Sequence, residues 1–140
     1  MMLNFTVPGP PQGKARARTV FNPHTGQTHS YTPDSTVLYE NLVKYSFLEQ
    51  CGRKKFEKDT PVYVSMLARY PIPKSASKKR TSQMISGTIR PTKKPDIDNI
   101  SKCILDALNT IAYHDDSQVV ELVIKKVYSS EPGVSVYMRD

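Results

Sequence analysis

The sequence predicts an α+β fold, with helices packed on a small mixed sheet. Some segments alternate apolar and polar residues, which is typical of strands, and two others repeat apolar residues every three or four positions, which is typical of helices. The chain has 140 residues, enough for one hydrophobic core, and shows no internal repeat. We therefore expect a single domain over residues 1–140, in the element order β-α-β-α-β-β with two long basic loops.

The first half of the chain is expected to form a strand, a loop and a helix. Phe5-Thr6-Val7 predicts a short strand that stops at Pro8. Residues 8–32 are rich in proline and glycine and are expected to form the first basic, mobile loop. Pro33 suits the first turn of a helix. A helix over about 33–51 follows from apolar residues at helical spacing: Val37, Leu38, Leu42, Tyr45 and Leu48.

The second half of the chain is expected to form a strand, a loop, a helix and two strands. Residues 62–69 alternate as in a half-buried strand, and the Ser/Thr-rich residues 71–95 are expected to form the second basic, mobile loop. Strands are expected over 119–128 and 134–138. Between them and the loop, a second amphipathic helix is predicted by Ile97, Ile100, Ile104, Leu105, Leu108 and Ile111.

The charge of the chain indicates a polyanionic partner. The net charge is +7, but residues 1–95 hold 16 basic and 5 acidic side chains, whereas residues 96–140 hold 4 and 8. Acidic residues repel a polyanion, so their presence needs a separate reason, and a divalent cation would supply one. The cations expected to contact the polyanion lie in the two loops: Lys14, Arg16, Arg18, Lys74, Lys78, Lys79, Arg80, Arg90, Lys93 and Lys94.

Several classes of protein are disfavoured. No apolar run approaches the roughly 20 residues of a membrane span, and the N-terminus does not resemble a signal peptide. Cys51 and Cys103 make neither a disulfide framework nor a zinc site. We expect a cytoplasmic protein with no membrane partner.

Three acidic residues and one lysine are the candidate catalytic residues. Asp96 and Asp98 stand one residue apart where a loop meets a helix, Lys102 lies one helical turn after Asp98, and Asp116 precedes a strand. Oxygen ligands without useful His or Cys favour Mg²⁺, with Mn²⁺ as a substitute. A lysine nearby can stabilise charge on phosphate oxygens. The pattern predicts metal-dependent hydrolysis of phosphodiesters.

Each of these residues also has a purely structural interpretation. From spacing alone, Asp98 can be a helix cap, Lys102 an ion-pair partner of Asp106, Asn99 a local hydrogen-bonding residue, and Asp115-Asp116 an ordinary turn. The basic loops can likewise serve only solubility.

The sequence of the whole acidic segment is a more specific signal of function than any of its residues alone. Three segments closely resemble the signature of the RusA family of Holliday junction resolvases, crossover junction endodeoxyribonucleases typically borne by prophages: Lys94-Pro95-Asp96-Ile97-Asp98-Asn99-Ile100-x-Lys102, Asp106-Ala107-Leu108-Asn109, and Asp115-Asp116-x-Gln118-Val119. The resemblance is dense over residues 94–119, about a fifth of the chain. In one departure, Thr110 stands where many members have glycine.

The resemblance implies a Mg²⁺-dependent homodimer that nicks opposing strands of four-way DNA junctions in recombination and repair. It places metal-binding carboxylates at Asp96, Asp98 and Asp116 and the catalytic lysine at Lys102. Asp115 and Asn99 are then supporting residues. Two alternative functions are a non-catalytic basic DNA-binding protein and a nuclease for other branched DNA, such as flaps.

The length of the predicted helix limits how such a site can be assembled. A helix from Asp98 to Ile111 is roughly 20 Å long, and the five residues onward to Asp116 reach about 17 Å when fully extended. A site within one chain therefore needs a shorter helix. Otherwise, Asp116 of one subunit most easily meets Asp96 and Asp98 of the other.

Overall fold

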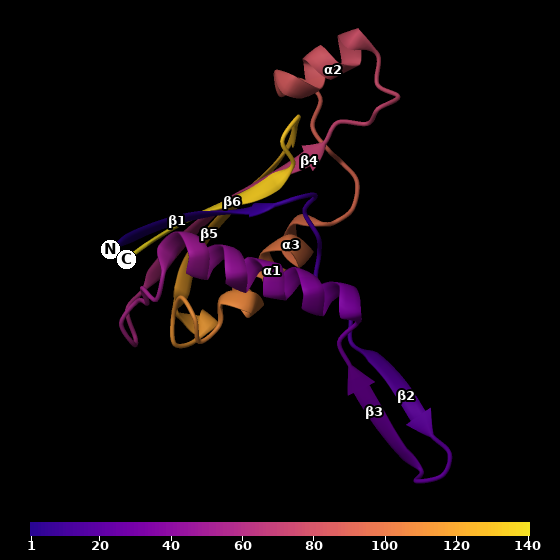
Figure 1. The fold of residues 1–140 in the computed structure, drawn as a ribbon, viewed down its shortest axis with the longest axis vertical. Helices are drawn as coiled ribbons and strands as arrows, with labels where there is room; N and C mark the ends of the chain where they lie inside the picture. The colour runs from indigo at the N-terminus through magenta and orange to yellow at the C-terminus, as the bar shows by residue number, and fades with distance from the viewer.

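The computed structural model describes all of residues 1–140 and contains a four-stranded mixed sheet in the order β1-β6-β4-β5 (Figure 1). β1 (Met2–Pro8) and β4 (Val62–Pro71) both lie antiparallel to β6 (Gly133–Arg139), and β4 lies parallel to β5 (Val119–Ser129). The predicted α+β class is confirmed. No helix in the chain has the length and apolar character that a membrane crossing requires.

The hydrophobic core lies between the sheet and two helices. Figure 1 shows α1 (Asp34–Cys51) and α3 (Ile97–Leu108) on the same side of the sheet. In β4, alternate residues from Val62 to Tyr70 are buried while most of those between them remain partly accessible, as the alternating pattern predicts. α3 buries Ile100, Ile104 and Leu108 completely against this face. The candidate acidic residues lie at the two ends of this helix.

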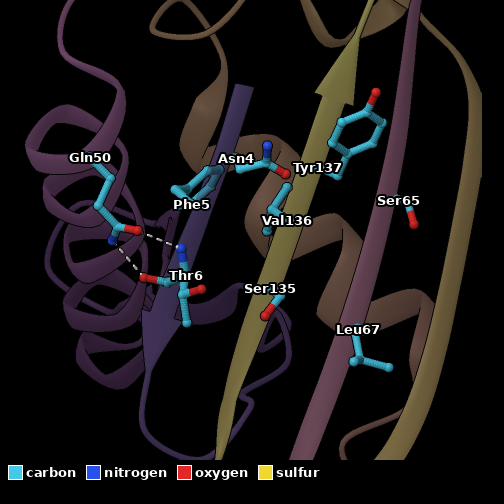
Figure 2. Close-up of a pocket in the computed structure, with 9 residues that line it drawn as sticks. All are labelled: Asn4, Phe5, Thr6, Gln50, Ser65, Leu67, Ser135, Val136 and Tyr137. Atoms are coloured by element: carbon cyan, nitrogen blue, oxygen red, sulfur yellow. Dashed lines mark hydrogen bonds between the residues drawn. The ribbon is translucent and has the colours of Figure 1, made fainter. Parts of the chain in front are cut away.

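The opposite face of the sheet holds a shallow pocket of about 420 Å³ (Figure 2). At its rim, the Gln50 side chain accepts a hydrogen bond from the backbone N–H of Thr6 at 2.9 Å and donates one to the Thr6 carbonyl at 2.8 Å. These bonds occupy part of the free edge of β1 and tie the end of α1 to it. No charged side chain lines the pocket. The lining consists of Asn4, Phe5, Thr6, Gln50, Ser65, Leu67, Ser135, Val136 and Tyr137.

The structure corrects the prediction that residues 8–32 form only loop. β2 (Arg18–Asn22) and β3 (Gln27–Tyr31) form an antiparallel hairpin, closed by a turn in which Gly26 has a φ of 69°. All residues of both strands are exposed. Because neither strand buries a face in the core, the sequence lacks the clear apolar alternation that marks a strand. The mobility of this segment stays a prediction.

The second predicted loop, residues 71–95, contains a helix, so that prediction was also wrong in part. In α2 (Lys78–Ile85), the Ser77 hydroxyl accepts a hydrogen bond from the backbone N–H of Arg80 at 3.2 Å. Met84 is its only buried residue. One apolar anchor in eight residues is too weak a periodic signal to predict a helix from sequence.

The second amphipathic helix is shorter than predicted. α3 ends at Leu108 instead of Ile111, and Thr110 adopts a φ of 68°. The left-handed region costs a β-branched residue more than it costs glycine. The Thr110 departure thus falls on the residue that turns the chain out of α3.

We expect Thr110→Gly to raise the free energy of unfolding by about 1 kcal/mol, because glycine tolerates a positive φ. Urea denaturation measures the change. Thr92→Gly, an exposed loop position with ordinary φ, is the matched control and should not stabilise the protein. Equal effects of the two substitutions would show that Thr110 is unstrained.

Candidate active site

Asp96 and Asp98 lie at the start of α3 with uncommitted carboxylates. Asp96 occupies the N-cap position with extended backbone, and its carbonyl accepts a hydrogen bond from the N–H of Ile100 at 3.0 Å. Asp98 lies in the first turn instead of at the cap, and neither side chain makes a capping hydrogen bond. Both residues are exposed. The capping interpretation of Asp98 is therefore wrong, and both carboxylates are free for a ligand.

Side chains from two neighbouring strands hold the segment that leads into Asp96. The Tyr70 hydroxyl donates to the Pro95 carbonyl, and Lys126 Nζ donates to the Lys93 carbonyl at 2.7 Å. The Lys126 ammonium also lies 4.9 Å from the Tyr70 ring centroid. Burial, followed by the nearby charge of Asp96, raises the pKa of Tyr70 to about 12. The phenol therefore stays protonated and keeps donating at neutral pH.

A polar pocket of about 410 Å³ adjoins Asp96, and a loop before the hairpin forms one wall. In this loop, the Lys14 N–H donates to the Asn99 carbonyl at 3.0 Å. A Cβ on Gly13 would lie 3.0 Å from the Asn99 Cβ and 3.2 Å from the Pro95 Cβ. Glycine therefore permits the loop to touch α3. The lining consists of Pro11, Gln12, Gly13, Lys14, Lys94, Pro95, Asp96 and Asn99.

The two lysines near the acidic pair are in different environments. Lys14 Nζ lies 2.6 Å from Glu40 Oε1 and 3.2 Å from Asp106 Oδ2, with 23% of its side chain exposed. Burial opposes its charged form, but these two carboxylates raise its pKa overall. Lys102 Nζ lies 3.6 Å from Asp106 Oδ2, with 63% of its side chain exposed. Lys14 thus joins α1 to α3, whereas Lys102 remains accessible to a ligand.

Asp116 lies at the other end of α3. Its backbone N–H donates to Asn109 Oδ1 at 3.1 Å, which fixes it beside the C-terminal cap of the helix. The neighbouring Asp115 side chain caps the short helical turn Asp116–Gln118. The hydrogen bond from the Ser117 hydroxyl lowers the pKa of Asp115. The Asp115 carboxylate is therefore engaged in hydrogen bonds within the turn that contains Asp116.

The structure brings Asp96 and Asp98 together but does not bring Asp116 to them. The twelve residues of α3 make a helix about 18 Å long, with the acidic residues at opposite ends. No three His, Cys, Asp or Glu side chains in the chain gather closely enough to hold a metal ion. Although α3 is shorter than predicted, the chain leaving it does not return to the helix start. One chain thus presents two parts of a possible metal site.

Most of the predicted DNA-contacting cations are exposed, on either side of Asp96. Arg16 and Arg18 lead into the hairpin, and the segment after α2 is attached to β5 through Arg90 Nε, which donates to the Lys126 carbonyl at 2.9 Å. Lys93 lies 5.8 Å from the Tyr128 ring centroid. The remaining predicted cations are also exposed, and they lie on or before α2 or at the polar pocket: Lys74, Lys78, Lys79, Arg80 and Lys94.

Sequence reasoning missed Tyr70 and Lys126 as residues that position Asp96. Tyr70 had a weak signal, since it ends a strand on the buried face. Lys126 had none, because its contact with the Lys93 carbonyl spans 33 residues of sequence.

The chain matches the family described as Endodeoxyribonuclease RusA over residues 8–139. It is 36% identical over 140 residues to the uncharacterized protein YqaN of Bacillus subtilis (strain 168), covering 99% of this chain and 96% of that protein. It is also 30% identical over 95 residues to the crossover junction endodeoxyribonuclease rusA of Lactococcus phage r1t, covering 67% of this chain and 66% of that protein.

We expect Tyr70→Phe to lower the free energy of unfolding by about 1 to 2 kcal/mol, because the partly buried Pro95 carbonyl loses its donor. Chemical denaturation measures the loss. Tyr45→Phe removes a hydroxyl from a ring that is 64% exposed and should change stability by less than about 0.5 kcal/mol. A Tyr70→Phe protein as stable as the control would show that the hydrogen bond is dispensable.

Proposed function

The chain belongs to the RusA family of endodeoxyribonucleases, and on this premise we propose that it is a Mg²⁺-dependent endonuclease that cuts four-way (Holliday) DNA junctions in recombination and repair. The observation that carries the proposal is the pair of free carboxylates, Asp96 and Asp98, in a chain of net charge +7. Exposed acids within a DNA-binding surface weaken binding unless a cation neutralises them. The name of the phage relative supports the same substrate.

The donor set suits a hard divalent cation. Asp96 and Asp98 offer only oxygen ligands beside a polar pocket, and the two cysteines are buried elsewhere. The proposed cation is Mg²⁺, for which Mn²⁺ can substitute. When bound, it would polarise a phosphodiester and make a bound water more acidic. Asp96 and Asp98 would hold it, and Asn99 would keep the adjoining loop in place through its carbonyl.

Lys102 is the residue proposed to stabilise the transition state. It lies one helical turn after Asp98 and on the same side of α3. Its contact with Asp106 is long and its side chain is mostly exposed, so it can turn towards a phosphate at little cost. Its ammonium would then offset negative charge that develops on the phosphate oxygens.

We infer that the active form is a homodimer in which each site uses both chains. Asp116 is held about one helix length away from Asp96 and Asp98. A two-fold axis perpendicular to α3 would place the partner's α3 antiparallel to it, and could so bring the partner subunit's Asp116 to the start of α3. The same symmetry matches a four-way junction, which needs two opposed cuts.

A nuclease assay tests the proposed activity. We expect Asp96→Asn to reduce Mg²⁺-dependent cleavage of an immobile four-way junction by roughly 100-fold or more, since a metal ligand is lost. Junction binding should be retained because a repulsive charge is removed. Asp34→Asn, in the first turn of α1, is the matched control and should cleave normally. Wild-type binding without cleavage would favour a non-catalytic DNA-binding protein, and faster cleavage of flaps would favour the other branched substrate.

Mixing two inactive proteins tests the shared site. In a heterodimer of Asp96→Asn and Asp116→Asn chains, a shared arrangement gives one site with both defects and one site with none, so nicking of one strand should return. A site confined to one chain leaves a defect in every site, and no nicking returns. Subunit exchange is verified with differently tagged chains. Failure of recovery despite exchange would contradict the shared site.

A further inference from the structure

The β2–β3 hairpin is the most prominent feature that the acidic site leaves unexplained. It projects from the N-terminal end of α1, away from the sheet (Figure 1), and Val20 and Phe21 are 50% and 60% exposed. An isolated two-stranded hairpin is marginally stable in water. We propose that this hairpin lies in the major groove of the DNA next to the cut and contacts base edges, so that it determines the sequence preference of cleavage. The inference rests on the proposed nuclease function.

The root of the hairpin lies against the start of α3. The Lys14 N–H donates to the Asn99 carbonyl, and the Ala15 N–H donates to Thr36 Oγ1 at 3.1 Å. β2 begins only three residues after Ala15, at Arg18. These contacts fix the base of the hairpin beside the pocket that contains Asp96. A DNA strand placed at Asp96 would therefore continue along the hairpin.

The charge of the segment favours DNA as its partner. Residues 1–33 contain no Asp or Glu, and Arg16 and Arg18 are exposed at the base of the hairpin. The segment thus offers cations and no acid, so DNA would be attracted to it at long range. A two-stranded β-ribbon also has a suitable width for the major groove.

The two faces of the hairpin differ in what they present. The pairing of the strands puts Val20 and His29 on one face, together with Arg18, Gln27 and Tyr31. The side chains of Arg18, Gln27 and His29 have no hydrogen-bond partner within the chain and can meet base edges. The other face carries Phe21, Thr28 and the hydrogen-bonded pair Thr19 and Ser30, whose hydroxyls lie 3.2 Å apart. The first face is the one proposed to contact the bases.

A library of four-way junctions with randomised base pairs around the branch point provides the test. The full-length protein is incubated with the library and Mg²⁺, and the cut ends are sequenced. We expect wild type to cut a subset of sequences preferentially. In Gln27→Ala/His29→Ala, the ratio of cleavage of preferred sequences to cleavage of the others should fall by at least about fivefold. Thr19→Ala/Thr28→Ala, on the opposite face, is the matched control and should keep it. All four positions are exposed and outside the hydrophobic core, so folding of the core is not at risk.

Two results would overturn the inference: cleavage by wild type without base preference, or an unchanged preference in Gln27→Ala/His29→Ala, whether this variant stays a dimer or shifts to a monomer in sedimentation. The shift to a monomer would make the hairpin a contact between subunits. If wild type cuts no junction, the proposed function fails separately. Selection of the same library by binding, in Ca²⁺, then tests whether the hairpin reads bases.

Discussion

The length of α3 is the constraint on which the rest of the site depends. Twelve helical residues separate Asp96 from the Leu108 end by about 18 Å, and the hydrogen bond from Asp116 to Asn109 keeps the third carboxylate at that far end. The distance between the two ends of α3 cannot shrink without unwinding a helix whose inner face is fully buried. The proposed three-carboxylate metal site would consequently need a second chain, and the proposed cleavage would then depend on dimerisation.

The position of α3 is fixed at its start and along its side by contacts near the proposed site. At its start, Tyr70 and Lys126 hold the carbonyls that precede Asp96. Along its side, Lys14 lies between Glu40 of α1 and Asp106 of α3, and partial burial makes these ion pairs stronger than surface pairs. The same residue begins the path to the hairpin. Lys14 is therefore a structural cation more than a free phosphate contact.

The sequence predicts the parts of the fold that bury a face. β4 and α3 follow clear periods of two and of three to four residues, because alternate side chains must enter one core. The spacing of Asp96, Asp98 and Lys102 predicts their places at the start of α3 because a helix has fixed geometry. The contact of Lys126 with Lys93 could not be predicted, since it depends on how β5 lies beside the loop.

The elements that the sequence did not predict share one physical property. β2, β3 and α2 bury almost nothing in the core, so their sequences are not constrained by a hydrophobic period. Their cations have no acidic neighbours in sequence, which fits the polyanion proposed as the partner. Core packing thus positions the acidic residues of the proposed chemistry, while the surface elements on either side of Asp96 carry the cations that are proposed to contact DNA.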